Sequence, residues 1–325
     1  MRFPPFINRI HQRSWLTTDR PGKKRALRGE QMPSDEEIRE LFLAGLCLVA
    51  PAKQVNVQAS SAGDALSVFR GSGLEYEESR FYQPGDDPRF INWRLSARSG
   101  KLQSKIFREE RRRATLIVID RRNSMRFGTH KRHKLAQAVR VAAVVAARSH
   151  REHASIETLL FDDYLNWSAP VTTEHALLGL LRQVVADVAP PTDEQREVGV
   201  DELLDLLEER LLPGTSITLI SDLSGFEERH ARRLMRLAGK NLLKVILLHD
   251  AAELQLPVAG RLQFEGAAGR FELDTTDLSV RNNFRQMAEA YFANKLALFR
   301  ELGIVCVMLS TLVDEPEKLL ADGGR

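Results

Sequence analysis

The stretch Ala114–Asp120 (ATLIVID) decides the fold of this chain. Three later stretches share its richness in Val, Ile and Leu and its lack of polar alternation; they are 215–222 (TSITLISD), 242–250 (LLKVILLHD) and 303–310 (GIVCVMLS). A fifth and weaker candidate is Ser155–Phe161 (SIETLLF). Such runs are typical of strands buried on both faces of a parallel sheet.

Amphipathic helical patterns separate these runs. Apolar residues recur at i, i+3 and i+4 in residues 134–148, 174–188, 200–212, 227–239 and 281–302. Alternation of strand and helix at this spacing predicts an α/β domain with a doubly wound, mostly parallel sheet over 114–325. A β-hairpin insert is expected near 251–280, because glycines mark turns around the β-like segment 262–274.

The N-terminal third has a different pattern. Residues 1–33 predict a basic, flexible tail, in which the first 30 residues carry eight Lys or Arg against two acids. Residues 34–113 predict a helix over 34–50, capped by Ser34, followed by a small β module with glycine-marked turns. The tail is a candidate for peripheral contact with an anionic membrane.

Composition excludes several classes of protein. The 325 residues contain 47 Lys or Arg and 44 Asp or Glu, so a uniformly basic nucleic-acid-binding coat is not expected. The apolar runs are too short to span a bilayer, and the N-terminus lacks the apolar core of an export signal. Two cysteines cannot build a disulfide framework. These features favour a globular cytoplasmic protein, with membrane association left open through the tail.

Two acidic residues end two of the predicted strands. Asp120 ends the first run and Asp222 ends the run 215–222. In a common doubly wound order these strands are neighbours at the switch point, where ligands of such sheets bind. Hydroxyls of Ser124 and of Thr172 or Thr173 follow nearby in sequence. Such oxygen ligands suit Mg²⁺ or Ca²⁺, although either aspartate alone is equally explained as a helix cap.

The same residues carry a resemblance to a known family. Residues 120–125 (DRRNSM) occupy the place of the Asp-x-Ser-x-Ser element of von Willebrand factor A domains, which with a later Thr and Asp forms a metal-ion-dependent adhesion site. The segments 71–76 (GSGLEY), 80–94 (RFYQPGDDPRFINWR), 96–102 (SARSGKL) and 107–110 (FREE) resemble the signature of the bacterial family called domain of unknown function 58. The resemblance covers about residues 71–147, and 220–225 fits a later Ser-Asp element of the family.

The resemblance implies a fold, a role and a partner. It implies a von Willebrand factor A-like domain acting as a non-catalytic adaptor in protein assembly or maturation. Its implied partner is a MoxR-type AAA+ ATPase, together with a client protein that the sequence does not identify. The matching site residues are Asp120, Ser124, Thr172 or Thr173, and Asp222.

Arg122 departs from the metal-binding pattern. It stands where the adhesion site has a serine, and a guanidinium stays charged and cannot bind a cation. Arg122 could itself neutralise Asp120 and Asp222, or it could point to solvent. We expect a degenerate site that binds divalent metal weakly or not at all, and no required cofactor.

The signature block combines acids, arginines and aromatic residues. Its candidate residues, for a clamp between the β module and the α/β domain or for a partner-binding face, are Asp86, Asp87, Arg89, Trp93, Arg94 and Arg98. Alternating charges of this kind form either a buried ion-pair cluster or a binding face. The clamp is the favoured interpretation.

Two other functional classes remain as alternatives. Asp120 and Asp222 could support a metal-dependent hydrolase, but the chain has no Walker, GxSxG or HExxH motif and no evident general base. His130/His133 and His150/His153 have helical spacing without a third zinc ligand. The basic tail and Arg111–Arg113 favour the other alternative, a protein that binds nucleic acid or a membrane surface. No specific nucleic acid is expected.

Overall fold

The computed structural model describes residues 32–48, 74–83, 85–109, 114–186, 197–266 and 269–321. It divides into two compact units. The larger unit comprises residues 1–51 and 113–325, and the smaller one comprises 52–112. Each unit is described separately below.

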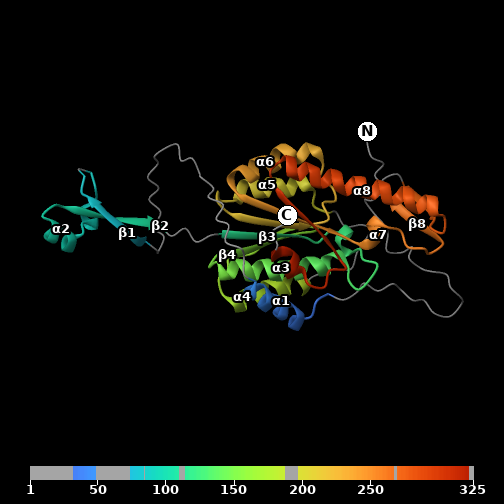
Figure 1. Ribbon diagram of the computed structural model, residues 1–325, viewed down its shortest axis with the longest axis horizontal. Helices are drawn as coiled ribbons and strands as arrows, with labels where there is room; N and C mark the ends of the chain where they lie inside the picture. Colours follow the sequence, from blue (N-terminus) through green and yellow to red (C-terminus); the bar gives the residue numbers. More distant parts are fainter. Residues whose placement is uncertain are drawn as a thin grey trace. The chain divides into compact units, whose positions relative to one another are not determined.

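A six-stranded sheet forms the centre of the larger unit (Figure 1). Its order is β10-β7-β6-β3-β4-β5, with bounds Val305–Ser310, Leu242–His249, Ser216–Ser221, Ala114–Asp120, Ser155–Phe161 and Leu165–Trp167. The short edge strand β5 is antiparallel to β4, and the other pairs are parallel. All five strands expected from the sequence are confirmed. The chain moves from β3 to β4 and later returns to β6 on the other side of β3, so the switch point lies between β3 and β6.

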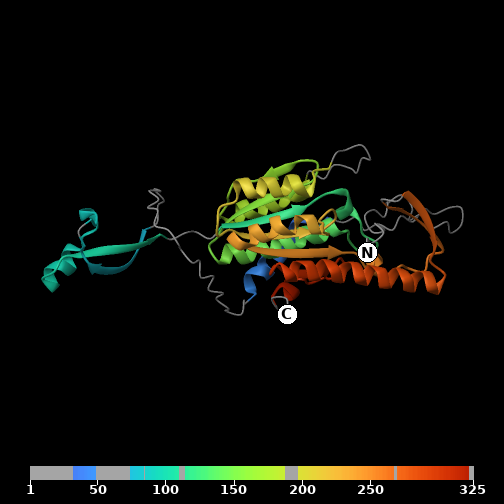
Figure 2. The same cartoon turned by 90° about the horizontal axis from the view of Figure 1, so that it is seen from above.

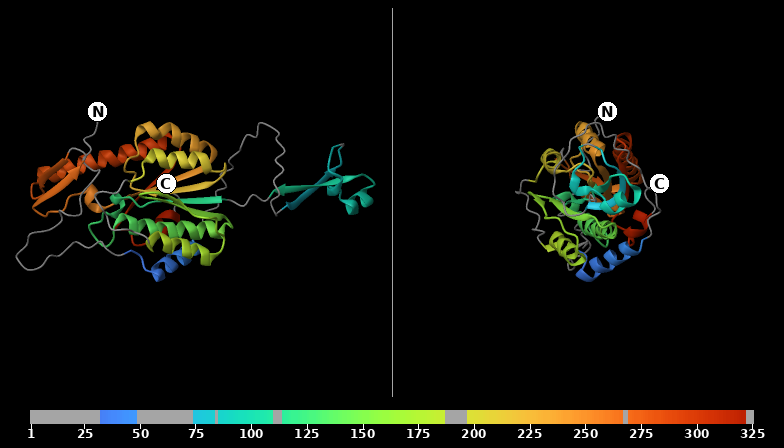
Figure 3. Two further views of the ribbon diagram at one scale, coloured as in Figure 1. Left: turned by 180° about the vertical axis from the view of Figure 1, so that it is seen from behind. Right: turned by 90° about the vertical axis from the view of Figure 1, so that its left-hand side faces the viewer.

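Helices cover both faces of this sheet, which confirms the α/β class (Figures 1 and 3). One face carries α1 (Asp35–Cys47), α3 (Lys134–Arg151) and α4 (Glu174–Ala186), and the other carries α5 (Val200–Arg210), α6 (Ala231–Lys240) and α8 (Leu278–Glu301). The short helix α9 (Pro316–Ala321) contacts α3. Successive β3 side chains alternate between two cores, with Ile117 and Ile119 in one and Leu116 and Val118 in the other. Burial on both faces explains why this strand lacks polar alternation.

Helix α1 belongs to the larger unit, which differs from the expected grouping of this helix with the β module. Ser34 caps it by accepting a hydrogen bond from the Glu37 amide at 3.1 Å, as the sequence predicts. Ile38 and Phe42 are buried in the core that α3 also lines. A β-carbon at Gly45 would lie 2.8 Å from the Ala147 β-carbon. The apolar face of α1 thus packs closely against the small residues of α3.

The smaller unit contains one antiparallel pair of strands. β1 (Leu74–Phe81) pairs with β2 (Gln103–Glu109), with a register shift between Tyr76 and Glu78. Between them lie the 3₁₀ turn η2 (Pro88–Phe90) and the helix α2 (Trp93–Ser99), where the sequence suggested mostly β structure. The Asn92 side chain caps α2 by accepting from the Leu95 amide, and Gly100 ends it at φ 68°. The part of the expected module over 55–73 lies outside the described residues.

The expected hairpin insert is present between β7 and α8 (Figure 2). It follows the short helix α7 (Ala251–Leu254) and consists of β8 (Arg261–Gly266) and β9 (Gly269–Asp274). Leu262 pairs with Leu273, and both contribute to a small cluster around Leu256 and Phe284. The hairpin therefore has a minor core of its own beside the first turns of α8.

Candidate functional site

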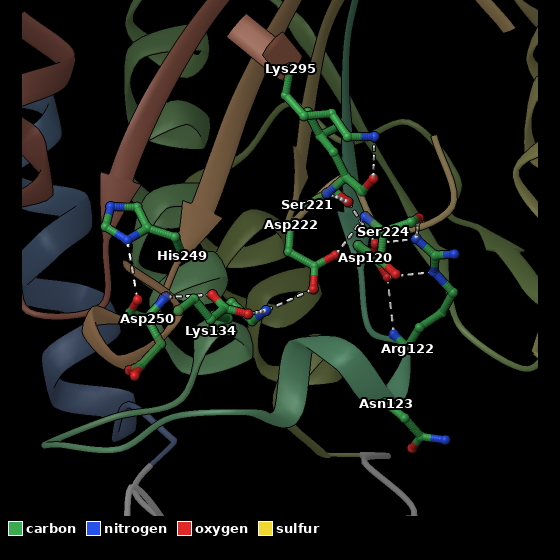
Figure 4. Close-up of polar contacts among 12 residues, drawn as sticks. Asp120, Arg122, Asn123, Lys134, Ser221, Asp222, Ser224, His249, Asp250 and Lys295 are labelled. Atoms are coloured by element: carbon green, nitrogen blue, oxygen red, sulfur yellow. Dashed lines mark hydrogen bonds and ion pairs between the residues drawn. The ribbon is translucent and has the colours of Figure 1, made fainter. Parts of the chain in front are cut away.

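Asp120, the last residue of β3, is completely buried and fully hydrogen-bonded (Figure 4). The Arg122 guanidinium donates to its two carboxylate oxygens, from Nε at 3.0 Å and from Nη2 at 2.7 Å. The Arg122 backbone N–H donates at 3.1 Å, and the Ser221 hydroxyl donates at 2.6 Å. The carboxylate is therefore held by a cation and a hydroxyl that both come from the protein.

Arg122 is fixed on several sides. Its guanidinium lies 4.2 Å from the centre of the Phe161 ring and donates to the Ser224 carbonyl at 2.8 Å. Burial opposes its charge, but the carboxylates of Asp120, Asp222 and Glu197 outweigh burial and raise the pKa of Arg122. The sequence left open whether the Arg122 side chain neutralises the acids or points to solvent. The structure places it against Asp120.

Asp222 has a different cation, which the sequence analysis did not identify. The Lys134 ammonium lies 2.8 Å from an Asp222 carboxylate oxygen and 2.7 Å from a Glu253 carboxylate oxygen. The Lys134 side chain is 2% exposed. Burial opposes the charge of this lysine, but the two carboxylates outweigh burial and raise its pKa. Burial opposes the ionisation of both acids. For Asp222 the charge of Lys134 outweighs burial and lowers the pKa. For Glu253 burial outweighs Lys134, and its pKa is raised.

Local structure places Lys134 in the site. It is the first residue of α3, directly after the cap His133, whose Nδ1 accepts from the Ala136 amide at 2.9 Å. Helix α3 starts at the carboxyl end of β3, so its first side chain reaches the strand ends. In the sequence Lys134 is simply the polar start of an amphipathic helix. One feature of the sequence sets it apart from a surface lysine: it lies four residues before Ala138, on the apolar face of the helix that becomes buried.

The loop after β6 is held in an unusual conformation. Leu223 has φ 57°, in the left-handed region, although it is buried and is not glycine. Its amide donates to the Ser221 hydroxyl at 2.8 Å, and the Ser224 amide donates to Asp222 at 2.9 Å. From α8, the Lys295 ammonium donates to the carbonyls of Leu223 and Phe226. These contacts fix the direction of the Asp222 side chain toward Lys134.

A further buried acid, Asp250, lies at the end of β7. The Asp250 carboxylate accepts from the Thr129 hydroxyl at 2.5 Å and from the Thr311 hydroxyl at 2.8 Å. The Asp250 amide in turn donates to Glu253 at 2.7 Å, which connects this acid to the Lys134 network. The sequence analysis missed Asp250 and Glu253. The position of Asp250 after an apolar run was the one available signal, because it matches that of Asp120 and Asp222.

Thr172 and Thr173 are not part of this site, contrary to the expectation. They follow Val171, which bridges Ile156 near the amino end of β4, whereas Asp120 pairs with Phe161 at its carboxyl end. Five residues of strand separate the two positions, roughly 16 Å. The antiparallel strand β5 returns the chain to the amino ends of the sheet. Thr173 instead lies before α4, where its hydroxyl accepts from the Ala176 amide at 3.4 Å.

Ser124 lies beside the acids but contacts neither of them through its hydroxyl. It belongs to the 3₁₀ turn Asn123–Arg126, and its buried Oγ has no hydrogen-bond partner within the described ranges. The neighbouring Asn123 side chain points away from the charged cluster (Figure 4). In the described parts of the chain, no three His, Cys, Asp or Glu side chains are arranged to hold a metal ion. Asp120 already has Arg122 as its side-chain cation, and Asp222 and Glu253 share Lys134.

The signature residues of the smaller unit form local ion pairs. Asp86 pairs with Arg80 at 2.6 Å, and Asp87 pairs with Arg89 at 2.9 Å. Arg89 is 87% exposed and Trp93 is 66% exposed. Arg94 and Arg98 are exposed on α2. Residues only two to six apart in sequence satisfy these charges, because the turn around η2 brings them together.

Sheet order and flanking helices together define a doubly wound α/β domain with a mostly parallel sheet. The chain belongs to the family described as "Protein of unknown function DUF58", whose model matches residues 78–293. It is 26% identical over 254 residues to "Uncharacterized protein Rv1480" of Mycobacterium tuberculosis, an alignment that covers 77% of this chain and 78% of the relative. A protein of Mycobacterium bovis, "Uncharacterized protein Mb1516", matches to the same extent.

Solved structures also resemble this chain. BatB from Bacteroides thetaiotaomicron is 13% identical with a TM-score of 0.42, over 65% of this chain and 96% of the other. An aerotolerance-related membrane protein from Bacteroides fragilis is 12% identical with a TM-score of 0.41, over 65% and 98%. The SpRpn10 VWA domain is 10% identical with a TM-score of 0.34, over 64% and 93%. Among the helices described for the present chain, none has the length and apolar character that a membrane crossing requires.

Proposed function

We propose that this protein is a non-catalytic adaptor that binds a protein partner at the carboxyl ends of its parallel strands without a divalent metal. The observation that carries this proposal is the Lys134 ammonium between Asp222 and Glu253, with Arg122 on Asp120. In a metal-dependent adhesion site the protein supplies acids and the ion supplies the charge that attracts an acidic ligand. Here Arg122 and Lys134 supply positive charge to these acids from within the protein.

This arrangement changes how a partner would be recognised. Buried, hydrogen-bonded pairs such as Arg122–Asp120 hold the strand ends in one conformation but offer no open coordination position. Recognition would then depend on the exposed rim around them. Tyr164, in the turn after β4, is 57% exposed, and its amide donates to Asp162, which pairs with Arg121 at 3.1 Å. An exposed tyrosine on a fixed turn is a typical anchor of a protein interface.

The resemblance supports a specific working partner. A MoxR-type AAA+ ATPase in the cytoplasm is the partner that it implies, with a client protein completing the assembly. A hydrolase is the weaker proposal, because Asp120 and Asp222 both accept from cations and neither is left as a general base.

Capture of the purified MoxR-type ATPase of the same organism tests the partner surface. Tyr164→Ser should weaken capture about tenfold or more, the loss typical of an aromatic anchor. Leu242→Ser is the matched control, because Leu242 is 62% exposed but begins β7 at the amino ends of the strands. Equal capture by both variants would show that this edge is not the binding surface. Binding of Mg²⁺ to the protein is measured in a separate experiment. An error about the metal-free site can therefore be distinguished from an error about the partner-binding edge.

A further inference from the structure

Four large apolar side chains of the smaller unit are exposed. Trp93 is 66% exposed, Phe81 60%, Leu102 49% and Phe90 37%. Among the side chains of this unit whose burial the structure describes, Ile91 is the one buried hydrophobic residue. Large apolar side chains that are exposed together in this way are typical of an interaction surface.

The same part of the unit is strongly cationic. Residues 79–105 contain six basic residues, namely Arg80, Arg89, Arg94, Arg98, Lys101 and Lys105, against Asp86 and Asp87. Both acids already have arginine partners, Arg80 and Arg89. Six positive and two negative charges leave a net charge of +4 on 27 residues, whereas the whole chain carries only +3.

Cations and apolar side chains are adjacent in this unit. The Lys101 ammonium lies 5.6 Å from the centre of the Phe81 ring. Next to them, the Tyr82 amide donates to the Leu102 carbonyl at 2.9 Å. Across β2, the Asn92 amide donates to the Gln103 carbonyl at 2.8 Å, which places Trp93 one residue from this strand. The backbone contacts thus hold the exposed apolar residues at one end of the strand pair.

We propose that this end of the smaller unit, the lipid-contact end, binds the surface of a membrane containing anionic phospholipids. Tryptophan, phenylalanine and leucine beside lysine and arginine are the residue types that enter the interface of a bilayer while their charges meet the headgroups. A nucleic-acid surface fits less well, because Leu102 has no stacking chemistry and Lys101 already covers the Phe81 ring.

A second cationic aromatic segment strengthens this inference. Residues 1–30 carry a net charge of +6 and include Phe3, Phe6 and Trp15. A single weak membrane signal gives marginal, reversible binding, and two signals in one chain give stable attachment. The proposal is independent of the protein-binding edge at Asp120 and Asp222.

Vesicle flotation of the full-length chain tests the proposal. The probes are vesicles of phosphatidylcholine alone and with about 30% phosphatidylserine, in about 0.1 M salt. We expect binding to the anionic vesicles only. Arg94→Glu/Arg98→Glu should weaken it roughly 30-fold, as expected for two lost basic contacts. Arg232→Glu/Lys240→Glu is the matched control, because it makes the same charge change on exposed residues of α6.

Tryptophan fluorescence provides a second readout. The emission of Trp93, isolated as the difference between wild type and Trp93→Phe, should shift to the blue when anionic vesicles are added. The proposal would be overturned if both charge variants lost vesicle binding equally. It would also be overturned if the emission of Trp93 did not shift. Preferential binding to a single-stranded oligonucleotide or to polyglutamate would overturn it as well, in favour of a nucleic acid or an acidic protein.

Discussion

The Lys134 ammonium and the Asp222 carboxylate form a buried ion pair at 2.8 Å, beside the carboxyl end of β6. Their positions are 88 residues apart in sequence. Glu253 shares the same ammonium at 2.7 Å. The cation at this edge of the sheet is therefore supplied by the chain itself, which has consequences for stability and for metal binding.

Removing the lysine should destabilise the fold. Lys134→Met leaves Asp222 and Glu253 buried without their cation, and we expect the free energy of unfolding to fall by about 3–5 kcal/mol. Denaturant titration measures the change. Lys131→Met is the control; Lys131 is 69% exposed in its pair with Asp314, and its loss should cost less than about 1 kcal/mol. Similar costs for the two variants would contradict a structural role of the Lys134 pair.

Divalent metal should not stabilise the wild-type protein. Addition of about 1 mM Mg²⁺ or Ca²⁺ should leave the melting temperature unchanged, because a ligand stabilises only when it binds the folded state. In Arg122→Ser/Lys134→Ala the acids Asp120, Asp222 and Glu253 lose both cations, and the same additions should raise the melting temperature of this variant. Calorimetric binding of Mg²⁺ to the wild type, abolished by Asp120→Ala, would refute the metal-free site.

Protonation of His133 should make the fold sensitive to mild acid. Burial, with a smaller effect of Arg126, lowers the pKa of His133 from 6.5 to about 4. Between these two pH values the unfolded chain binds the proton and the folded chain does not, so stability falls as pH falls. The slope should reach about 1.4 kcal/mol per pH unit, with a total of roughly 3 kcal/mol.

His133→Asn isolates this contribution. Asparagine keeps a side-chain oxygen that caps α3 but does not titrate. We expect the free energy of unfolding of this variant to lose much of its decline between pH 6.5 and pH 4. His175→Asn, at an exposed position on α4, should keep the wild-type slope. If His133→Asn also keeps that slope, the acid sensitivity has another origin.

The close contact between α1 and α3 leaves no room for a methyl group at Gly45. A β-carbon at Gly45 would lie 2.8 Å from the Ala147 β-carbon and 3.1 Å from the Val144 carbonyl oxygen. Gly45→Ala should therefore destabilise the protein by about 1–3 kcal/mol, despite the better helix propensity of alanine.

The matched control for this contact is on α4. A β-carbon at Gly179 would have no neighbouring atom within 4 Å, so Gly179→Ala should stabilise the protein by about 0.5–1 kcal/mol. Thermal melting compares the two variants. Opposite signs are expected, and stabilisation by both would mean that α1 does not pack against α3 as closely as described.

Local patterns were sufficient to predict much of the fold. Ala114–Asp120 and its counterparts are apolar on both faces, which only a covered parallel sheet requires, and the five predicted strands are present. The cap at Ser34 and the hairpin insert were equally visible. Helix α2 was missed because its seven residues are too few to show a helical period. The place of α1 was missed because its partner α3 begins about 90 residues later.

The candidate site was only partly predictable. Asp120, Asp222 and Arg122 follow from strand ends and from the departure from a known motif, because both are local features of the sequence. Thr172 and Thr173 were misplaced because the turn of β5 reverses the chain, and nothing in a hydroxyl pattern reveals a reversal. Lys134 and Glu253 were missed because a lysine in the first turn of a helix and a glutamate in a short loop helix are ordinary surface residues in sequence.

The sequence by itself determined the strand and helix pattern, the acids at the strand ends and the arginine two residues after Asp120. Only the tertiary structure decided which cation each acid receives. The reason is physical. Hydrophobic periodicity is fixed by neighbours within a few residues, whereas the pairs from Lys134 to Asp222 and to Glu253 join positions 88 and 119 residues apart. Such pairs form only after the sheet brings its carboxyl ends to one edge and water has been excluded from them.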